Sequence, residues 1–400
     1  MTSPLSPEMK DDDHLQKALR PQSFKDFVGQ DGVLNNLKTF IKAAKERGKP
    51  LDHVLLSGPP GLGKTSLAHL MAHEMNVMCH TTSGASIARS GELAALLTNL
   101  KPGDILFIDE IHRLNKTIEE ILYPALEDGC LDLMVGEGPG AHSVRLTLSP
   151  FTLVGATTRQ GLLSRPLRDR FGILGQMSFY TPEALGLILE RAASKSDILL
   201  EKDAFHYLAQ RARGTPRIAL RLLRRIHDFA LVHKPSFLDE VFVEQCLKAL
   251  GVDSLGLDSF DQRYVTCLYK NFQGGPVGID TLAAALFEER TTLEEVIEPF
   301  LTQKGFIRRT PRGRVLGQKA YEHFGWPQPH KPEATGHTTQ AFYAADHEHA
   351  CRSSEHSLKH PMALSTLKAT DLKSNRALAQ EEGESFESCD PRLSQKAQRK

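Results

Sequence analysis

A glycine-rich stretch between two apolar runs constrains the fold of this chain more than any other feature. It reads Gly58-Pro59-Pro60-Gly61-Leu62-Gly63-Lys64-Thr65, follows the apolar run 54–56 and opens the helical pattern 66–70. Glycines at these positions let backbone N–H groups close around phosphate oxygens, and the N-terminus of the following helix adds its dipole. We therefore predict a phosphate-binding loop between a buried strand and a helix, with a nucleoside triphosphate as its ligand.

The end of this loop supplies the chemistry that a triphosphate needs. The ammonium of Lys64 can reach the terminal phosphates, and the hydroxyl of Thr65 can ligate Mg²⁺. A nucleoside triphosphate with Mg²⁺ is therefore the predicted ligand, and Gly61 and Ser66 belong to the same predicted site. A glycine-rich turn without a ligand is the alternative, which the flanking strand and helix disfavour.

A second predicted strand carries two carboxylates at its end. The apolar run 104–108 is typical of a buried parallel strand and ends in Asp109 and Glu110. In this place Asp109 can hold Mg²⁺, usually through water, while Glu110 polarises the attacking water. We therefore predict hydrolysis of the nucleotide. Two solvated acids at a strand end are the simpler alternative.

Bulk properties narrow the class of protein. A chain of 400 residues is long enough for two to four domains, and 49 Lys and Arg balance 49 Asp and Glu, so nucleic-acid binding must rest on a local patch. Six scattered cysteines argue against a disulfide framework and against a thiolate metal site. No apolar segment is long enough for a bilayer, and residues 1–13 are polar and acidic and do not have the charged-then-apolar pattern of a leader, so we expect a cytoplasmic protein.

Short apolar strands alternate with helices over 17–181, which predicts an α/β domain with a parallel sheet covered on both faces. Inside it, apolar and polar residues alternate on both sides of the turn 136–140 and predict a β-hairpin over 130–148. Its apolar residues suggest a docking surface, and a simple edge hairpin is the alternative.

The spacing of apolar residues divides the rest of the chain into two further domains and two terminal segments. Helical spacing over 182–253 predicts a small all-α lid domain, whose first helix is capped by Thr181. Three helices and two short strands joined at 311–313 predict a winged helix over 254–327. Residues 1–16 are polar and residues 328–400 lack apolar periodicity, so we expect a flexible N-terminal segment and a disordered tail.

A set of short motifs occurs in a fixed order between residues 19 and 326. Together they resemble the RuvB family of bacterial Holliday-junction branch-migration motors, which are AAA+ ATPases. The first few are shared by AAA+ ATPases in general, whereas the whole ordered set is specific. Besides the phosphate loop, they are Phe27-Val28-Gly29-Gln30, Asp109-Glu110-Ile111-His112-Arg113, Gly138-Pro139-Gly140, Gly155-Ala156-Thr157-Thr158-Arg159, Leu167-Arg168-Asp169-Arg170-Phe171-Gly172, Gly214-Thr215-Pro216-Arg217 and Arg309-Thr310-Pro311-Arg312-Gly313-Arg314.

The resemblance implies roles that the bare sequence only permits. Thr158 resembles the polar group that senses the γ-phosphate, and Arg217 resembles the residue that reports this phosphate to the lid. Arg170 resembles an arginine finger offered to the ATP of a neighbouring subunit. A surface charge is the alternative for each arginine. Further nucleotide-binding positions implied by the resemblance are Leu19, Arg20, Glu127, Asp128, Gly129 and Tyr180.

Positive charge gathers in the predicted wing, where no acidic residue occurs between 302 and 319. Such a cluster contacts phosphates and gives affinity without sequence choice, with a steep salt dependence. The resemblance implies that Arg309 and Arg314 contact DNA. The cations of the cluster are Lys304, Arg308, Arg309, Arg312, Arg314 and Lys319.

The resemblance also implies partners. Two homohexameric rings would flank a junction-binding protein of the RuvA type, which would grip hairpin 130–148, and would pull duplex DNA through Holliday junctions in recombination and repair. A junction resolvase is a further candidate partner, and no membrane is expected. Two alternatives remain: a replication-initiator or clamp-loader ATPase, which loads a ring instead of travelling, and a winged-helix transcription regulator for which ATP is only a ligand.

Overall fold

The structure is a computed structural model that describes residues 21–135, 142–196 and 198–328, all within the first of the chain's two compact units, Met1–Pro329. Several predictions concern residues outside these ranges. They are the flexible segment 1–16, the disordered tail beyond residue 328, the nucleotide contacts of Leu19 and Arg20, and the hairpin turn with its Gly138-Pro139-Gly140 motif.

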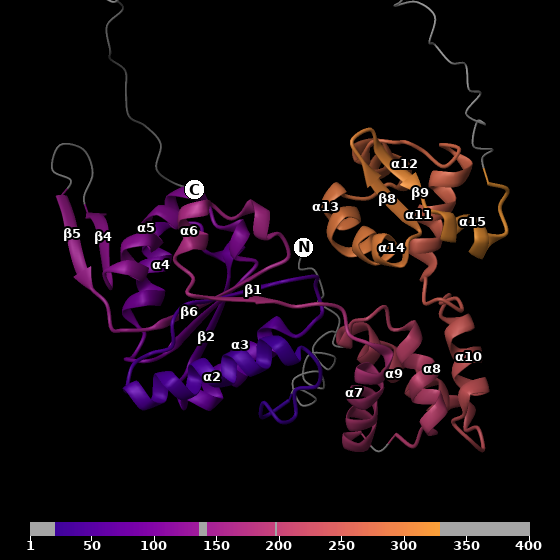
Figure 1. The fold of residues 1–400 in the computed structure, drawn as a ribbon, viewed down its shortest axis with the longest axis horizontal. Helices are drawn as coiled ribbons and strands as arrows, with labels where there is room; N and C mark the ends of the chain where they lie inside the picture. Colours follow the sequence, from indigo (N-terminus) through magenta and orange to yellow (C-terminus); the bar gives the residue numbers. More distant parts are fainter. Residues whose placement is uncertain (1–20, 136–141, 197, 329–400) are drawn as a thin grey trace, which may run out of the picture. The chain divides into compact units, whose positions relative to one another are not determined.

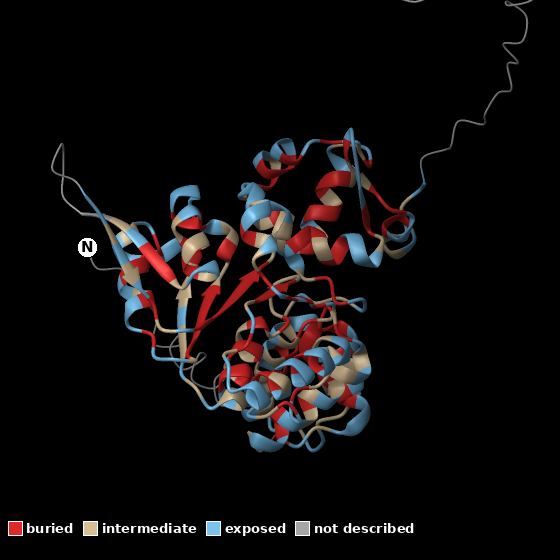
Figure 2. Ribbon diagram, turned by 60° about the vertical axis from the view of Figure 1, so that its left-hand side comes forward, coloured by how far each residue is buried: buried red, intermediate tan, exposed pale blue. Residues whose placement is uncertain are grey.

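A five-stranded parallel sheet forms the core of the first part of the chain (Figure 1). The strand order is β2-β3-β6-β1-β7, so the two strands predicted to flank the site, β1 and β3, are separated only by β6. All residues of β1 and β6 are buried, as Figure 2 shows for the inner strands. The strands are β1 Val54–Ser57, β2 Cys79–Ser83, β3 Ile105–Asp109, β6 Thr152–Thr157 and β7 Ile173–Gln176.

Successive residues of the inner strands feed two separate apolar cores, because side chains alternate across a strand. Leu56 and Phe107 pack on one face with helices α2 and α3, whereas Leu55 and Leu106 pack on the other face with α4 and α5. Helices therefore cover both faces, as predicted. The helical elements of this part are α2 Asp31–Arg47, α3 Lys64–Met75, α4 Ser90–Thr98, α5 Lys116–Glu127 and α6 Arg165–Asp169, with short 3-10 turns at Gly84–Ser86, Ile111–Arg113 and Gln160–Leu162.

The hairpin predicted over 130–148 is present as a separate two-stranded antiparallel sheet of β4 (Cys130–Val135) and β5 (His142–Thr147) (Figure 1). Its base is fixed, because Leu131 is fully buried in the core and the N–H of Leu148 donates to the carbonyl of Gly129 at 2.8 Å. On the exposed side Arg145 and Asp132 pair across the strands at 2.9 Å.

Four helices follow the sheet and pack on one another through their apolar faces. The first begins as predicted, since the Thr181 hydroxyl accepts from the N–H of Ala184 and Pro182 stands in the first turn. The helices are α7 Pro182–Lys195, α8 Lys202–Arg211, α9 Pro216–His233 and α10 Glu240–Ala249. Among the described residues, no helix combines the length and the apolar character that a membrane span requires.

The remaining described residues form a winged helix around a third apolar core. The third predicted helix, 293–301, is interrupted: a π turn (Leu293–Ile297) joins α13 to α14, and this turn carries Glu294 and Glu295. A last helix after the wing was not predicted. The elements are α11 Ser259–Lys270, α12 Ile279–Leu286, α13 Arg290–Thr292, α14 Glu298–Lys304, β8 Ile307–Thr310, β9 Gly313–Leu316 and α15 Gln318–Phe324.

Candidate functional site

Three neighbouring strands bring the predicted catalytic groups to one edge of the sheet. Because they are parallel, β1 leads into the phosphate loop, β3 into Glu110 and β6 into Thr158 at the same edge. A cavity of about 880 Å³ lies beside this edge. Its lining includes Gly61, Lys64, Thr65, Ser66, Asp109, Glu110, Tyr180 and Arg217, all predicted at the sequence level.

The phosphate loop has the backbone that its glycines allow. Gly58 and Gly61 have φ angles of 143° and 80°, a region that residues with a Cβ rarely adopt. A Cβ on Gly61 would also stand 3.1 Å from the Cβ of Arg217, so glycine is what permits the lid to approach the loop. The N–H of Arg217 lies 3.4 Å from the carbonyl of Gly61.

Lys64 is the first residue of α3 and is only 7% exposed. Its ammonium donates to the carbonyls of Gly58 and Pro59 at 2.8 and 2.9 Å, so it is oriented within the loop. Burial lowers the pKa of Lys64, while the carboxylates of Glu110 and Asp109 act in the opposite direction. A fixed cation with two carboxylates nearby is suited to a ligand that brings its own negative charge and a divalent ion.

Glu110 occupies a strained position directly after β3. Its φ angle is 47°, which is uncommon for a residue other than glycine and is often associated with functional sites. Its carboxylate lies 3.2 Å from Nδ1 of His112, whose side chain is 6% exposed, and 3.2 Å from the hydroxyl of Thr158. Burial lowers the pKa of His112, which favours the neutral imidazole. Two polar side chains therefore orient Glu110.

Thr158 does not line the cavity but contacts Glu110, which does. Its hydroxyl also lies 3.4 Å from the carboxylate of Glu295 on the π turn, and a hydroxyl has only one hydrogen to donate. The adjacent Arg159 pairs with Glu295 at 2.7 Å and with Glu294 at 3.4 Å. The end of β6 is thus in contact with two acids of the winged helix.

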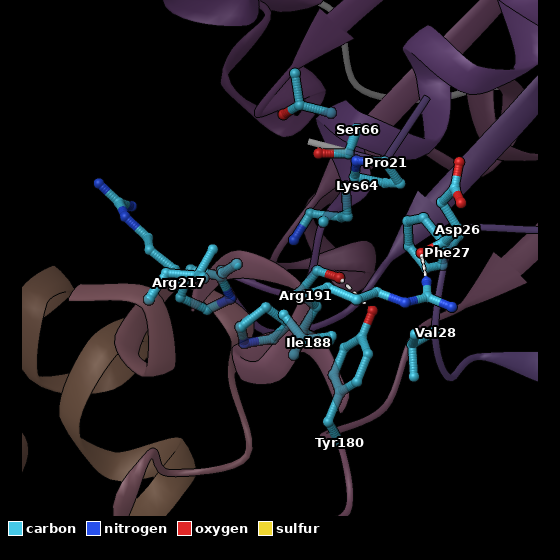
Figure 3. Close-up of a pocket in the computed structure, with 18 of the residues that line it drawn as sticks. Pro21, Asp26, Phe27, Val28, Lys64, Ser66, Tyr180, Ile188, Arg191 and Arg217 are labelled. Carbon is cyan, nitrogen blue, oxygen red and sulfur yellow. Dashed lines mark hydrogen bonds between the residues drawn. The ribbon is translucent and has the colours of Figure 1, made fainter. Parts of the chain in front are cut away.

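Tyr180 and Arg217 also line the cavity, and each contacts the phosphate loop (Figure 3). The Tyr180 hydroxyl donates to the carbonyl of Leu62 at 3.0 Å, and burial raises the pKa of this side chain. Arg217 comes from the first turn of α9, so the lid contributes a cation to the cavity.

Sequence reasoning did not identify Arg191 as part of the site. This residue of α7 lines the cavity and donates to the carbonyl of Asp26 at 2.7 Å, a contact drawn in Figure 3. It ties the lid to the segment before α2. A cation on the polar side of an amphipathic helix gives no sequence signal for such a contact. Leu19 and Arg20 are outside the described residues, while the next residue, Pro21, lines the cavity.

Four predicted nucleotide-binding residues lie together but away from this cavity. Glu127, Asp128, Gly129 and Arg170 are absent from its lining. Instead, Arg170 Nη2 pairs with Glu127 Oε2 at 3.0 Å, and Nη1 donates to the carbonyl of Pro166 at 2.7 Å. The chain therefore presents these groups at a second place on its surface.

In the wing, the two predicted DNA-binding arginines are already paired with acids from α14 and the π turn. Arg314 is 15% exposed and contacts Glu298 at 2.9 Å and Glu294 at 3.1 Å. Arg309 is 48% exposed and contacts Glu298 at 2.7 Å. Glu298 itself is fully buried and also accepts from the Tyr264 hydroxyl at 2.9 Å.

The other cations of the wing are differently placed. Lys304, Arg308, Arg312 and Lys319 are exposed, and within the described ranges no salt bridge engages Arg308 or Arg312. These four side chains are directly available to an anion. Arg309 and Arg314 contact the acidic residues of α14 and the π turn through Nε and Nη2, so a phosphate could be bound through Nη1 or in exchange for a carboxylate partner.

Comparisons with known proteins agree with this arrangement along most of the chain. Family models match in three consecutive stretches: the Holliday junction DNA helicase RuvB P-loop domain over 19–177, the RuvB AAA lid domain over 180–253 and the RuvB C-terminal winged helix domain over 254–325.

Individual relatives give the same result. A Holliday junction branch migration complex subunit RuvB from Paramagnetospirillum magneticum is 57% identical over 325 residues, which cover 81% of this chain and 93% of the relative. The structure of the Thermotoga maritima RuvB Holliday junction branch migration motor is 48% identical, with a TM-score of 0.72, and covers 78% of this chain and 99% of that chain. A point mutant of the same Thermotoga protein gives 48% identity and a TM-score of 0.73 at the same coverage. The chain, with its phosphate loop, lid and winged helix, therefore belongs to the RuvB family.

Proposed function

We propose that this chain is an ATP-driven motor that moves Holliday junctions by pulling duplex DNA, as a homohexameric ring. Membership of the RuvB family supports the activity, and one structural observation supports the ring. Lys64 and Glu110 line the nucleotide cavity, whereas Arg170 lies outside it beside Glu127. If Arg170 completes the catalytic site, it must therefore reach the cavity of another subunit.

Each residue of the cavity has a role in this proposal. Lys64 exchanges its loop carbonyls for terminal phosphate oxygens, Glu110 orients the attacking water, and Thr158 senses the γ-phosphate. Arg170 arrives from the neighbouring subunit and stabilises the charge that develops on the transferred phosphoryl group. Arg217 reports the same phosphate to the lid. Tyr180 and Arg20 border the adenine and ribose side of the nucleotide, and Leu19 is a further nucleotide contact.

Thr65 and Asp109 fit a Mg²⁺ site. Both line the cavity next to Lys64, and their hydroxyl and carboxylate oxygens are the hard donors that this ion prefers. When bound, Mg²⁺ neutralises charge on the β- and γ-phosphates. Ser66 completes the polar end of the loop.

The proposal divides the work among three domains, 17–181 for hydrolysis, 182–253 as the lid and 254–327 for DNA. Loss of the γ-phosphate releases Thr158, Arg170 and Arg217, and the lid then moves the winged helix with its DNA contacts. The wing holds the phosphate backbone without reading bases, through its exposed cations and through Arg309 and Arg314. A motor that travels along DNA requires such contacts.

The proposed partners follow from the same surfaces. Hairpin 130–148 is the docking site for a RuvA-type junction-binding protein, since its base is fixed in the core and its strands form a separate sheet. Double-stranded DNA at Holliday junctions occupies the wing, and a junction resolvase is a further candidate. The proposed location is the cytoplasm.

A junction-unwinding assay tests the proposal. The purified chain is combined with labelled four-way DNA, ATP, Mg²⁺ and a RuvA-type protein, and ATP turnover and strand separation are followed together. We expect both to require the partner and the junction, and strand separation to stop in Glu110→Gln. ATP turnover without any movement of the junction would favour a ring-loading ATPase, and absence of turnover under all conditions would favour a pure nucleotide-binding regulator.

A further inference from the structure

Three groups surround the guanidinium of Arg170, and the only aromatic side chain among them, Tyr123, has no assigned role. The guanidinium pairs with Glu127 and donates to the carbonyl of Pro166. The ring of Tyr123 lies under it, with 4.4 Å between the ring centroid and the guanidinium carbon. The Tyr123 hydroxyl in turn lies 3.0 Å from Oγ of Ser164. Glu127 and Tyr123 both belong to α5, and they stand one helical turn apart.

The aromatic ring compensates for a missing hydrogen bond. Nε of Arg170 is buried and has no hydrogen-bond partner among the described residues, which would ordinarily carry a cost. A cation within about 6 Å of a ring centroid is attracted by the negative face of the ring. Arg170 therefore rests on Tyr123 while its terminal nitrogens are directed to Glu127 and Pro166.

Ser164 connects the ring to the helix that carries the arginine. Its Oγ accepts from the N–H of Leu167 at 3.4 Å and so caps α6, and Arg170 follows directly at the end of this helix. Tyr123 consequently contacts both ends of this short helix, through its hydroxyl at Ser164 and through its ring at Arg170. The ring of Tyr123 thus sets the direction of the arginine together with Glu127, while its hydroxyl only adds a contact at the start of α6.

We propose that Tyr123 is the positioning residue of Arg170, and that it holds the guanidinium in the geometry required by the nucleotide of the neighbouring subunit. The inference rests on the proposed role of Arg170 as an arginine finger. A long, flexible side chain must lose rotamer freedom before it can stabilise a transition state, and a stacked ring removes much of that freedom beforehand. Tyr123 itself does not line the nucleotide cavity of its own chain.

The test compares Tyr123→Leu, which removes the ring, with Tyr123→Phe, which removes only the hydroxyl. ATP turnover is measured on the assembled protein with junction DNA. Because the finger acts on charge that develops during the reaction, we expect Tyr123→Leu to lower kcat about two- to thirtyfold, the range of a cation–π contact, with KM for ATP nearly unchanged. Tyr123→Phe should retain most of the wild-type kcat. Tyr207→Leu is the matched control, because Tyr207 also lies under an arginine, Arg211, but in the lid.

Mixed rings separate a positioning role from a structural one. When Tyr123→Leu subunits are mixed with Glu110→Gln subunits, some interfaces combine an intact Glu110 with an intact Tyr123 from the neighbour. Turnover per Tyr123→Leu subunit should then rise. A normal kcat in Tyr123→Leu, an equal loss in Tyr123→Phe, or no recovery in mixed rings would overturn the proposal.

Comparing Arg170→Ala with Tyr123→Leu distinguishes an error in this inference from an error in the proposed role of Arg170. If Arg170→Ala keeps normal turnover, Arg170 is not a catalytic finger and both ideas are wrong. If Arg170→Ala loses turnover while Tyr123→Leu keeps it, only the role of Tyr123 is wrong.

Discussion

Arg170 and Glu127 form a 3.0 Å ion pair at a place that contributes nothing to the lining of the nucleotide cavity of the same chain. Both residues resemble nucleotide-binding positions of the family, so their separation from the cavity is informative. A single chain holds the two halves of the proposed catalytic site at different places, and a complete site would form only between neighbouring chains.

Arg170→Ala should bind ATP normally and lose hydrolysis. An arginine finger contributes roughly 10³- to 10⁵-fold to turnover, and the variant leaves every residue of the cavity in place. Nucleotide affinity by calorimetry and ATP turnover with junction DNA are the two measurements. Mixing this inactive variant with inactive Glu110→Gln should restore part of the turnover. Normal turnover by Arg170→Ala alone would contradict the assignment.

Arg312→Ala should weaken DNA binding uniformly across sequences without affecting stability. Arg312 is exposed in the wing, and one lost phosphate contact lowers the salt dependence of binding by about one unit in the log–log slope. Binding of a duplex at several salt concentrations measures the slope. We expect the free energy of unfolding to change by less than about 0.5 kcal/mol. An unchanged slope would remove Arg312 from the DNA-binding surface.

Arg314→Ala should reduce both DNA binding and stability. This arginine shares the fully buried Glu298 with Arg309, and its removal leaves a buried carboxylate with one cation fewer. Breaking a buried ion pair on one side costs about 3–5 kcal/mol, although the remaining Arg309 should reduce that value. Urea denaturation compared with Arg312→Ala measures the difference. Equal stability of the two variants would show that the pairing with Glu298 is unimportant.

Glu295→Gln should raise ATP turnover in the absence of DNA. The Glu295 carboxylate lies 3.4 Å from the Thr158 hydroxyl and competes with Glu110, at 3.2 Å, for its single hydrogen. A hydrogen bond contributes about 0.5–1.5 kcal/mol, so we expect an increase of about two- to tenfold. Steady-state turnover without and with DNA is measured, and the exposed Glu289→Gln serves as control. A lower turnover would mean that Glu295 assists Thr158.

Asp104→Asn should destabilise the core sheet at neutral pH but not in acid. Burial alone would raise the pKa of Asp104, but hydrogen bonds from His80 and from the N–H groups of Lys101 and Met78 lower it below its ordinary value of 3.8. A lowered folded-state pKa gives stability above the unfolded pKa, and this stability is lost as the pH falls through the folded pKa. We expect a loss of about 1–3 kcal/mol near pH 7 that shrinks towards pH 3, measured by urea denaturation. If Asp104→Asn lowered the free energy of unfolding equally at pH 3 and pH 7, the charged form of Asp104 would not be the source of the stability.

Much of the nucleotide site was predictable, because its signals are local. The phosphate loop and the Asp109-Glu110 pair are contiguous motifs whose chemistry depends on neighbours in the chain. The half-buried edge strand β2 (Cys79–Ser83) escaped prediction because its residues are mostly polar and lack the apolar run of β3. Sequence periodicity therefore identified the inner strands but not this edge strand.

The electrostatic partners were not predictable, because they are distant in the chain. The stretch 302–319 contains only cations, yet Arg314 and Arg309 meet Glu298 in the fold. Likewise, the contact of Tyr123 with Arg170 joins α5 to the end of α6, and neither residue type indicates the other. Such pairings depend on how helices pack and not on spacing along the chain.

The base of the hairpin is short and is anchored in the core of the domain. Helix α5 ends at Glu127, β4 begins at Cys130, and Leu131 is fully buried in the core. Only two residues separate α5 from β4, so no long flexible linker can extend when a force acts on the two strands. A force on the hairpin would therefore act on the last turn of α5. The same turn carries Glu127, which pairs with Arg170, so such a force would also change the position of Arg170.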